Sequence, residues 1–170
     1  MKTSFILSIL LAVTFACFCQ EKIIEANLSL TLPNESWVLL KKQDVNNLQV
    51  YFYKRESIPD SLGRTVIPTI SVVIEGVSKD VNAITYSMMK RSKMLFKVDK
   101  VFTNQEGSLD LMTAIGYKGT YTDKFGEHLL YIVHAVNNEK GIQIIMDALS
   151  LISSKIEPEF KVALKSLKFD

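Results

Sequence analysis

The sequence predicts an α+β fold in which an antiparallel β-sheet lies between helices, as an α/β/α sandwich. Residues 117–150 contain three runs rich in Val, Ile, Leu and Tyr, separated at residues 123–126 and 138–141. Polar clusters that end in Gly between such runs indicate hairpins. Side chains alternate across a strand, and those of residues 127–137 are largely apolar on both faces. Both faces of the sheet therefore need a cover, which two helices can supply.

Local patterns place the other strands. Residues 27–32, 49–54, 68–75, 97–103 and 111–121 are rich in β-branched and aromatic residues, which favour strands. Residues 55–67 contain Pro59, Gly63 and few bulky side chains. Such a composition predicts a long exposed loop.

Two helices are expected. Asp80 suits the N-cap of a helix over residues 80–96, because its carboxylate can accept a hydrogen bond from a free N–H of the first turn. Pro158 can occupy the first turn of a closing helix, where no needed N–H is lost. Each helix has a stripe at helical spacing, formed by Val81, Ile84, Met88, Ser92 and Leu95 in the first and by Phe160, Leu164 and Leu167 in the second.

The first 19 residues differ from the rest of the chain. One Lys precedes an unbroken apolar run, a pattern typical of a secretory signal peptide; an uncleaved membrane anchor is the alternative. Cleavage after Cys19 would leave residues 20–170 as a single domain. The pair Ala16-Cys17 also suits lipid attachment at Cys17. We therefore expect a protein exported to the periplasm or secreted, with a lipid-anchored envelope protein as the alternative.

Composition excludes several chemistries. Both cysteines lie in the first 19 residues, so the expected domain has no disulfide, thiol nucleophile or thiolate metal site. The chain has 20 basic and 18 acidic residues, and removal of Lys2 leaves a mature net charge of about +1. This near balance argues against nucleic acid as a partner.

The order of elements, together with a few motifs, resembles a known family. The motifs are Leu30-Thr31-Leu32-Pro33 followed by Trp37, the helix over residues 80–96, Gly119-Thr120-Tyr121, and Pro158-Glu159-Phe160 followed by Leu164 and Ser166-Leu167. Over residues 27–169 this pattern resembles the PsbP-like superfamily, which includes bacterial DcrB-like lipoproteins and a eukaryotic Ran-binding import factor. The resemblance implies the α/β/α sandwich and no single activity, because its members are mostly accessory or binding proteins.

The chain has two histidines, and neither forms a recognisable catalytic motif. His128 and His134 are six residues apart on one strand face, roughly 20 Å at about 3.3 Å per residue, which is too far to share a metal ion. His134 and Asp147 lie on neighbouring strands, where such a pair could orient a general base or form a structural hydrogen bond. Neither a nucleophile elbow nor a phosphate loop is present. We expect no enzyme, no cofactor and no metal site; a small hydrolase using His134 and Asp147 is the alternative.

Two further stretches are candidates for binding. The loop at residues 55–67 carries Arg55, Asp60 and Arg64, and loops on a rigid sheet often hold ligand-binding residues. The basic run at residues 90–100 can meet an anionic membrane surface or an acidic partner, or form an ordinary solvated surface. The sequence therefore predicts an exported accessory or binding module for a small ligand or a protein, with peripheral membrane association as a further option.

Overall fold

The computed structural model of the chain describes residues 20–170. The predicted signal peptide at residues 1–19 and the alternative lipid-attachment residue Cys17 lie outside the described residues. Among the helices of residues 20–170, none is long and apolar enough to cross a membrane.

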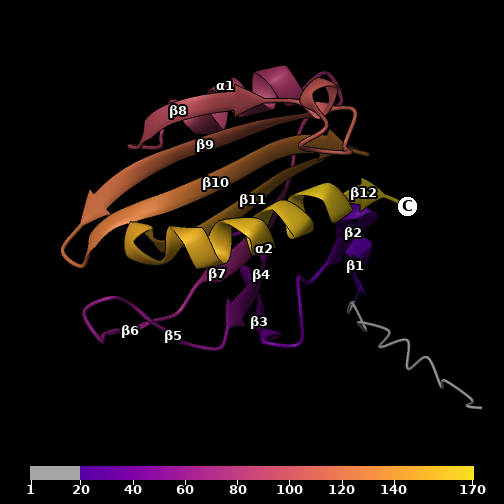
Figure 1. Cartoon of the computed structure of the whole chain (residues 1–170). Coiled ribbons are helices and arrows are strands. Elements are labelled where there is room, and N and C mark those ends of the chain that lie inside the picture. The colour runs from indigo at the N-terminus through magenta and orange to yellow at the C-terminus, as the bar shows by residue number, and fades with distance from the viewer. Residues whose placement is uncertain (1–19) are drawn as a thin grey trace, which may run out of the picture.

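A seven-stranded antiparallel sheet forms the centre of the fold (Figure 1). Across the sheet the strands follow the order β3 (Trp37–Val45), β4 (Leu48–Arg55), β7 (Thr69–Gly76), β11 (Lys140–Leu149), β10 (Gly126–Asn137), β9 (Ala114–Asp123) and β8 (Lys97–Phe102). The expected hairpins of β9 with β10 and of β10 with β11 are confirmed by the strand pairing. β11 is the middle strand of the sheet.

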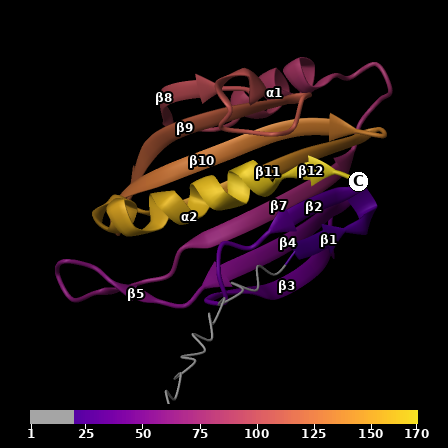
Figure 2. The same cartoon turned by 45° about the vertical axis from the view of Figure 1, so that its right-hand side comes forward.

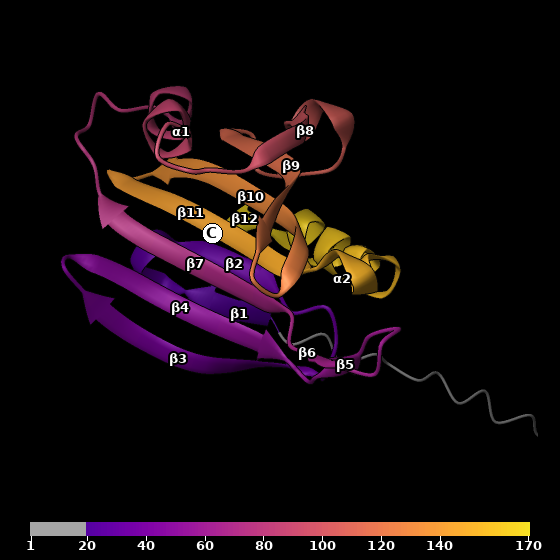
Figure 3. The ribbon, with the colours of Figure 1, turned by 90° about the vertical axis from the view of Figure 1, so that its left-hand side faces the viewer.

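Two helices cover opposite faces of this sheet, as the end view in Figure 3 shows. The short helix α1 (Ala83–Arg91) covers one face, and the longer helix α2 (Ser153–Ser166) covers the other. Beside α2 lies a small sheet of β1 (Gln20–Ile23), β2 (Leu28–Thr31) and β12 (Lys168–Phe169) (Figure 2). Short 3-10 turns η1 (Ile24–Ala26) and η2 (Asn104–Glu106) connect elements. The expected α+β sandwich is confirmed.

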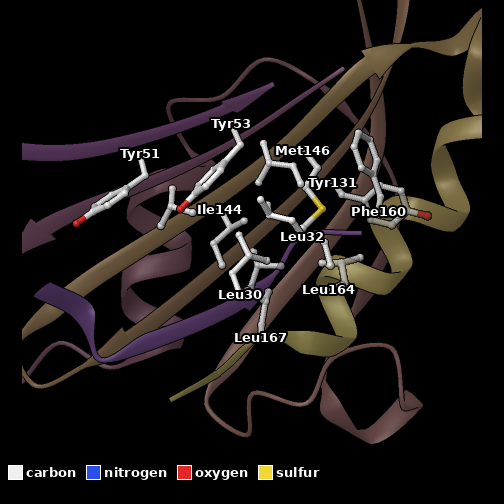
Figure 4. Packing of buried hydrophobic residues seen from close by; sticks show 14 of the residues in the cluster. Leu30, Leu32, Tyr51, Tyr53, Tyr131, Ile144, Met146, Phe160, Leu164 and Leu167 are labelled. Carbon is white, nitrogen blue, oxygen red and sulfur yellow. The ribbon is translucent and has the colours of Figure 1, made fainter. Parts of the chain in front are cut away.

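The sheet face under α2 holds most of the apolar core (Figure 4). The Phe160 ring is fully buried, with its centroid 6.1 Å from that of Tyr131 on β10 and 6.2 Å from that of Trp37 at the start of β3. The stripe expected on the closing helix is confirmed, since all three of its members are buried: Phe160, Leu164 and Leu167. α2 therefore seals this face of the sheet.

α2 begins earlier than expected. It starts at Ser153, so Pro158 lies more than one turn inside the helix, and the expectation that Pro158 occupies the first turn is wrong. Ile156, ahead of the proline, is fully buried in the core. This burial favours an early start and outweighs the backbone hydrogen bond that proline cannot make.

The helix expected over residues 80–96 is shorter than the sequence predicts. Its N-cap is Asn82 rather than Asp80, because the Asn82 side chain accepts a 2.9 Å hydrogen bond from the Thr85 N–H. The helix ends at Arg91. The residues that follow form a separate connection to β8.

The face of α1 that meets the sheet also differs from the expected stripe. Its buried residues are Ala83, Tyr86 and Ser87. The stripe prediction is wrong, because Ile84 and Met88 are exposed. The Tyr86 hydroxyl donates a 2.8 Å hydrogen bond to Glu75, and the ring packs over Gly141, where an added Cβ would lie 2.4 Å from Tyr86 Cε2. Because the sheet face beneath α1 is partly polar, the side of α1 that carries Tyr86 is buried against it.

Replacement of Phe160 by Ala is expected to lower the free energy of unfolding by about 3–5 kcal/mol, because it leaves a cavity against Tyr131 and Trp37. Val162 lies on the outer side of the same helix and is 41% exposed. Val162→Ala is the matched control and should change the free energy of unfolding by less than about 0.5 kcal/mol. Urea unfolding followed by circular dichroism measures both variants. Equal effects would mean that α2 does not seal the sheet.

Candidate functional site

Several connections meet at one end of the sheet, which we call the loop end (left side of Figure 1). His128 near the start of β10 pairs with Leu149 at the end of β11, and Thr69 at the start of β7 pairs with Asp147. The loop end comprises the hairpin of β5 (Ile58–Pro59) and β6 (Thr65–Val66), the segment of residues 92–96, the β9–β10 turn at residues 123–126, and the short helix η3 (Ser150–Ile152).

The loop end is open on the α1 face because α1 is short. The 9 residues of α1 span about 13 Å at 1.5 Å per residue. The 12 residues of β10 span about 40 Å at 3.3 Å per residue. α1 packs over His134, while His128 on the same face lies closer to the β9–β10 turn. The helix therefore leaves the His128 end of this face uncovered.

A hydrogen-bonded cluster of four side chains occupies this uncovered part. His128 Nδ1 lies 2.7 Å from Asp147 Oδ1, and His128 Nε2 lies 3.2 Å from Asp123 Oδ1. The Tyr121 hydroxyl donates to Asp147 Oδ2 at 2.6 Å, and its ring stacks on the imidazole with centroids 4.5 Å apart. Burial, together with the Asp147 carboxylate, raises the pKa of Tyr121. Its hydroxyl therefore stays protonated and remains a donor.

Both ring nitrogens of His128 are held by carboxylates of the chain itself, whereas a general base needs a nitrogen free to accept a proton from the reacting group. Asp123 accepts hydrogen bonds from the N–H groups of Phe125 and Gly126 in the turn, and the first of these bonds contributes most to lowering its pKa. In residues 20–170, no group of three His, Cys, Asp or Glu side chains is placed to hold a metal ion. The cluster therefore ties the β9–β10 turn to β11.

The expected pairing of His134 with Asp147 is wrong. β10 and β11 are joined by a two-residue turn at residues 138–139, where both residues have positive φ. This register places Gln143 opposite His134. Asp147 lies further along β11 and reaches His128 instead.

His134 belongs to a separate buried network under α1. Its Nδ1 lies 3.0 Å from Ser87 Oγ, and its Nε2 lies 3.1 Å from the Gln143 amide nitrogen. The Tyr117 hydroxyl lies 2.7 Å from Ser87 Oγ. Burial lowers the pKa of His134 to about 4, and the charge of Lys90 adds to this effect. Ser87 and His134 are fully buried, so a substrate has no access to this pair and the network is structural.

The three candidate residues of the expected loop do not meet at one site. Arg55 donates to both carboxylate oxygens of Glu159 on α2 and links β4 to that helix. Asp60 is buried and accepts hydrogen bonds from the Leu62 N–H and from the backbone and side chain of Arg64. Most of the expected long loop is exposed, but Asp60 is buried and its bonds build the β5–β6 hairpin within the loop.

A hollow of about 450 Å³ opens at the loop end, beside β6 and the β9–β10 turn. Of the sequence candidates, only Arg64 and Asp147 reach it. Its walls are mostly apolar and also carry a few polar groups; the lining residues are Arg64, Thr65, Val66, Ile67, Thr69, Phe125, His128, Asp147, Ala148 and Leu149. From the sequence, His128 was considered only as a metal ligand, and Phe125 was missed.

Each connection of the loop end exposes a large apolar side chain. Leu62, Leu95, Phe125 and Leu151 are 70%, 97%, 60% and 51% exposed, respectively. Lys124 Nζ lies 4.8 Å from the Phe125 ring centroid, so a positive charge lies next to this exposed aromatic ring. The loop end thus exposes one large apolar side chain on each connection, and the hollow lies beside Phe125.

The basic run at residues 90–100 does not form one continuous charged surface. Lys90 forms an ion pair with Glu75, and Arg91 donates to two backbone carbonyls in the connection after α1. Lys97 lies 3.5 Å from Asp99. Part of the basic run therefore makes contacts within the folded chain.

Solved structures share this architecture at low sequence identity. Cyanobacterial PsbP from Synechocystis matches 94% of this chain and 96% of its own, with a TM-score of 0.55 and 11% identity. The chain has the PsbP-like fold. The yeast Ran-binding protein Mog1p matches with a TM-score of 0.52 and 7% identity, and a Pseudomonas aeruginosa protein of unknown function with 0.56 and 13%; each comparison covers 89% of this chain and 96% of the other. No family model and no curated protein matches the sequence.

His134→Gln is expected to flatten the dependence of stability on pH. The folded PsbP-like domain keeps His134 neutral down to a pKa of about 4, whereas the unfolded chain takes up a proton near pH 6.5. The contribution of neutral His134 to the free energy of unfolding is fully present above pH 6.5. It is lost as the pH falls toward 4, because protonation then stabilises the unfolded chain. Between pH 6.5 and 5 the loss is about 1.5 kcal/mol.

Urea unfolding at these two pH values tests the role of His134. The natural chain should lose more stability than the variant over this interval. The comparison of slopes corrects for any loss of stability that the substitution causes at both pH values. The same loss in both proteins would contradict a buried, neutral His134.

Proposed function

We propose that this protein is an exported, non-catalytic binding module that docks a partner protein through its loop end. The observation that carries this function is a large exposed apolar side chain on each connection of that end. Apolar side chains that several connections expose at one end of a protein are candidates for a surface that another molecule covers. The hollow beside Ile67 and Phe125 provides room for a side chain of the partner.

Four observations support a non-catalytic role. Each ring nitrogen of His128 and His134 lies within hydrogen-bonding distance of another group of the chain. Residues 20–170 contain no cysteine, and Ser87 beside His134 is fully buried. The yeast protein of similar fold is described as Ran-binding, so this architecture serves protein binding in that case.

The hollow and its rim indicate the chemistry of the partner. Its apolar walls suit a large apolar side chain, the usual anchor of a protein interface. Arg64 lines the hollow but its Nε is held by Asp60, so the charge at the edge comes mainly from Lys124, which lies against Phe125. Asp147 is already bound by His128 and Tyr121. We therefore expect the partner to present an apolar anchor with an acidic residue beside it.

Selection from a random peptide library displayed on phage tests this surface. The described domain, residues 20–170, is immobilised and the enriched peptides are sequenced. We expect them to share a large apolar residue next to Asp or Glu. Phe125→Ser should weaken their binding by about tenfold or more, because it removes one wall of the hollow. Fluorescence anisotropy with synthetic peptides measures the change.

Met112→Ser is the matched control, because Met112 is 81% exposed but lies outside the loop end. It should leave peptide affinity unchanged. Equal losses in the two variants, or enrichment of basic peptides, would contradict docking at the loop end. Sedimentation with anionic phospholipid vesicles that is lost in Phe125→Ser would show that the loop end meets a membrane instead.

Export is part of this proposed function and is supported by the apolar run of residues 1–19. Mass spectrometry of the protein purified from its native cells tests it. Cleavage after Cys19 predicts a mature chain that begins at Gln20, whereas lipid attachment predicts a lipid-modified chain that begins at Cys17. An intact N-terminal Met1 on an intracellular protein would contradict export.

A further inference from the structure

A second hollow, of about 440 Å³, lies between α2 and the β8 side of the sheet. Its apolar lining consists of Phe102, Tyr131 and Leu164, all members of the buried core. The ring centroids of Phe102 and Tyr131 are 6.2 Å apart in an edge-to-face arrangement. These side chains are at most 5% exposed, so their edges form a small apolar floor in the hollow.

Four lysines surround this apolar surface: Lys100, Lys118, Lys161 and Lys165. They come from β8, β9 and α2, so the fold gathers them from distant parts of the sequence. We call this hollow and its lysines the lysine groove. Such convergence of positive charge around a concave apolar surface is typical of a site for an anionic ligand.

The carboxylates of the lysine groove leave part of this charge uncompensated. Lys118 and Lys161 share one carboxylate, since both lie within 3.1 Å of Glu157 Oε1. Burial opposes ionisation of Glu157, but hydrogen bonds from Lys118, Tyr131 and Lys161 lower its pKa to about 2. The Glu157 carboxylate is therefore ionised and balances only one of the two lysines.

The other acidic group of the groove, Glu106, has a structural role, although its charge also acts on Lys100. Glu106 caps η2 by accepting hydrogen bonds from the backbone N–H and the hydroxyl of Thr103. Within residues 20–170, Lys100 and Lys165 are exposed and form no ion pair with a carboxylate. The lysine groove thus carries four positive charges and two negative ones.

We propose that the lysine groove binds a small amphipathic anion, an aromatic or aliphatic group that carries one carboxylate or phosphate. The apolar part lies on Phe102, Tyr131 and Leu164, and the anionic part lies between Lys100 and Lys165. This site differs from the loop end, because Leu164 and Lys165 belong to the last turn of α2 whereas the loop end adjoins its start. Binding here does not depend on the proposed docking of a protein.

Isothermal titration calorimetry with three probes tests the lysine groove. 1-Naphthyl phosphate combines both features, 1-naphthol lacks the anionic group, and inorganic phosphate lacks the apolar group. The natural domain should bind 1-naphthyl phosphate at least about tenfold more tightly than either of the others. Affinity for 1-naphthyl phosphate should fall as the salt concentration rises.

Charge reversal identifies the groups that bind the probe. The double variant Lys100→Glu and Lys165→Glu should bind 1-naphthyl phosphate about tenfold or more weakly. Both side chains are exposed, so circular dichroism should show an unchanged fold. The double variant Lys79→Glu and Lys155→Glu is the matched control, because both lysines are exposed outside the groove and the net charge changes by the same amount; its affinity should not change.

Three results would overturn this inference. No binding of 1-naphthyl phosphate at millimolar concentration would exclude the site. Equal affinity for 1-naphthol would show that the lysines contribute nothing to recognition. An equal loss in the double variant Lys79→Glu and Lys155→Glu would show that only the overall charge matters and that no site exists at the groove.

Discussion

The fold depends on one constraint, the burial of the central strands β10 and β11 from both sides. Ile144 and Met146 illustrate the face under α2, whereas His134 and Gln143 lie under α1; all four are buried. The α2 face is closed by apolar packing and the α1 face by a partly polar network. Because α1 is much shorter than β10, it closes only part of its face. The open loop end is therefore a direct consequence of how the sheet is covered.

Much of the fold could be predicted from the sequence. Apolar runs separated by polar turn residues determine the central hairpins. The helical spacing of apolar residues determines which side of α2 is buried. The exposed side of α1 was predicted as buried, because the stripe containing Ile84 and Met88 is more apolar than the side that carries Tyr86. The stripe rule assumes an apolar surface beneath a helix, whereas α1 lies over His134. β3 was not predicted from the sequence. Its residues after Trp37 are mostly exposed at the sheet edge, so they do not alternate between apolar and polar as those of a half-buried strand would.

The candidate site was less predictable, because it depends on register and on the extent of coverage. The sequence suggested a turn over residues 138–141 because that cluster ends in Gly141. Gly141 is instead a strand residue, and its lack of a side chain leaves room for Tyr86. The true two-residue turn moves Asp147 from the expected contact with His134 to His128. Arg64 was predicted as a binding residue only because it lies in the loop at residues 55–67. The open part of the α1 face has no local sequence signal, since it follows from the length of α1 relative to β10.

Native-state hydrogen exchange tests the central claim most directly, because it measures how strongly each part of the sheet is covered. Amides of β10 and β11 should exchange only through global unfolding, with protection equal to the free energy measured by urea. Amides of α1 and of residues 92–96 should exchange by easier, local opening. Protection of β10 and β11 no greater than that of α1 would contradict a structure built on a central sheet covered from both sides.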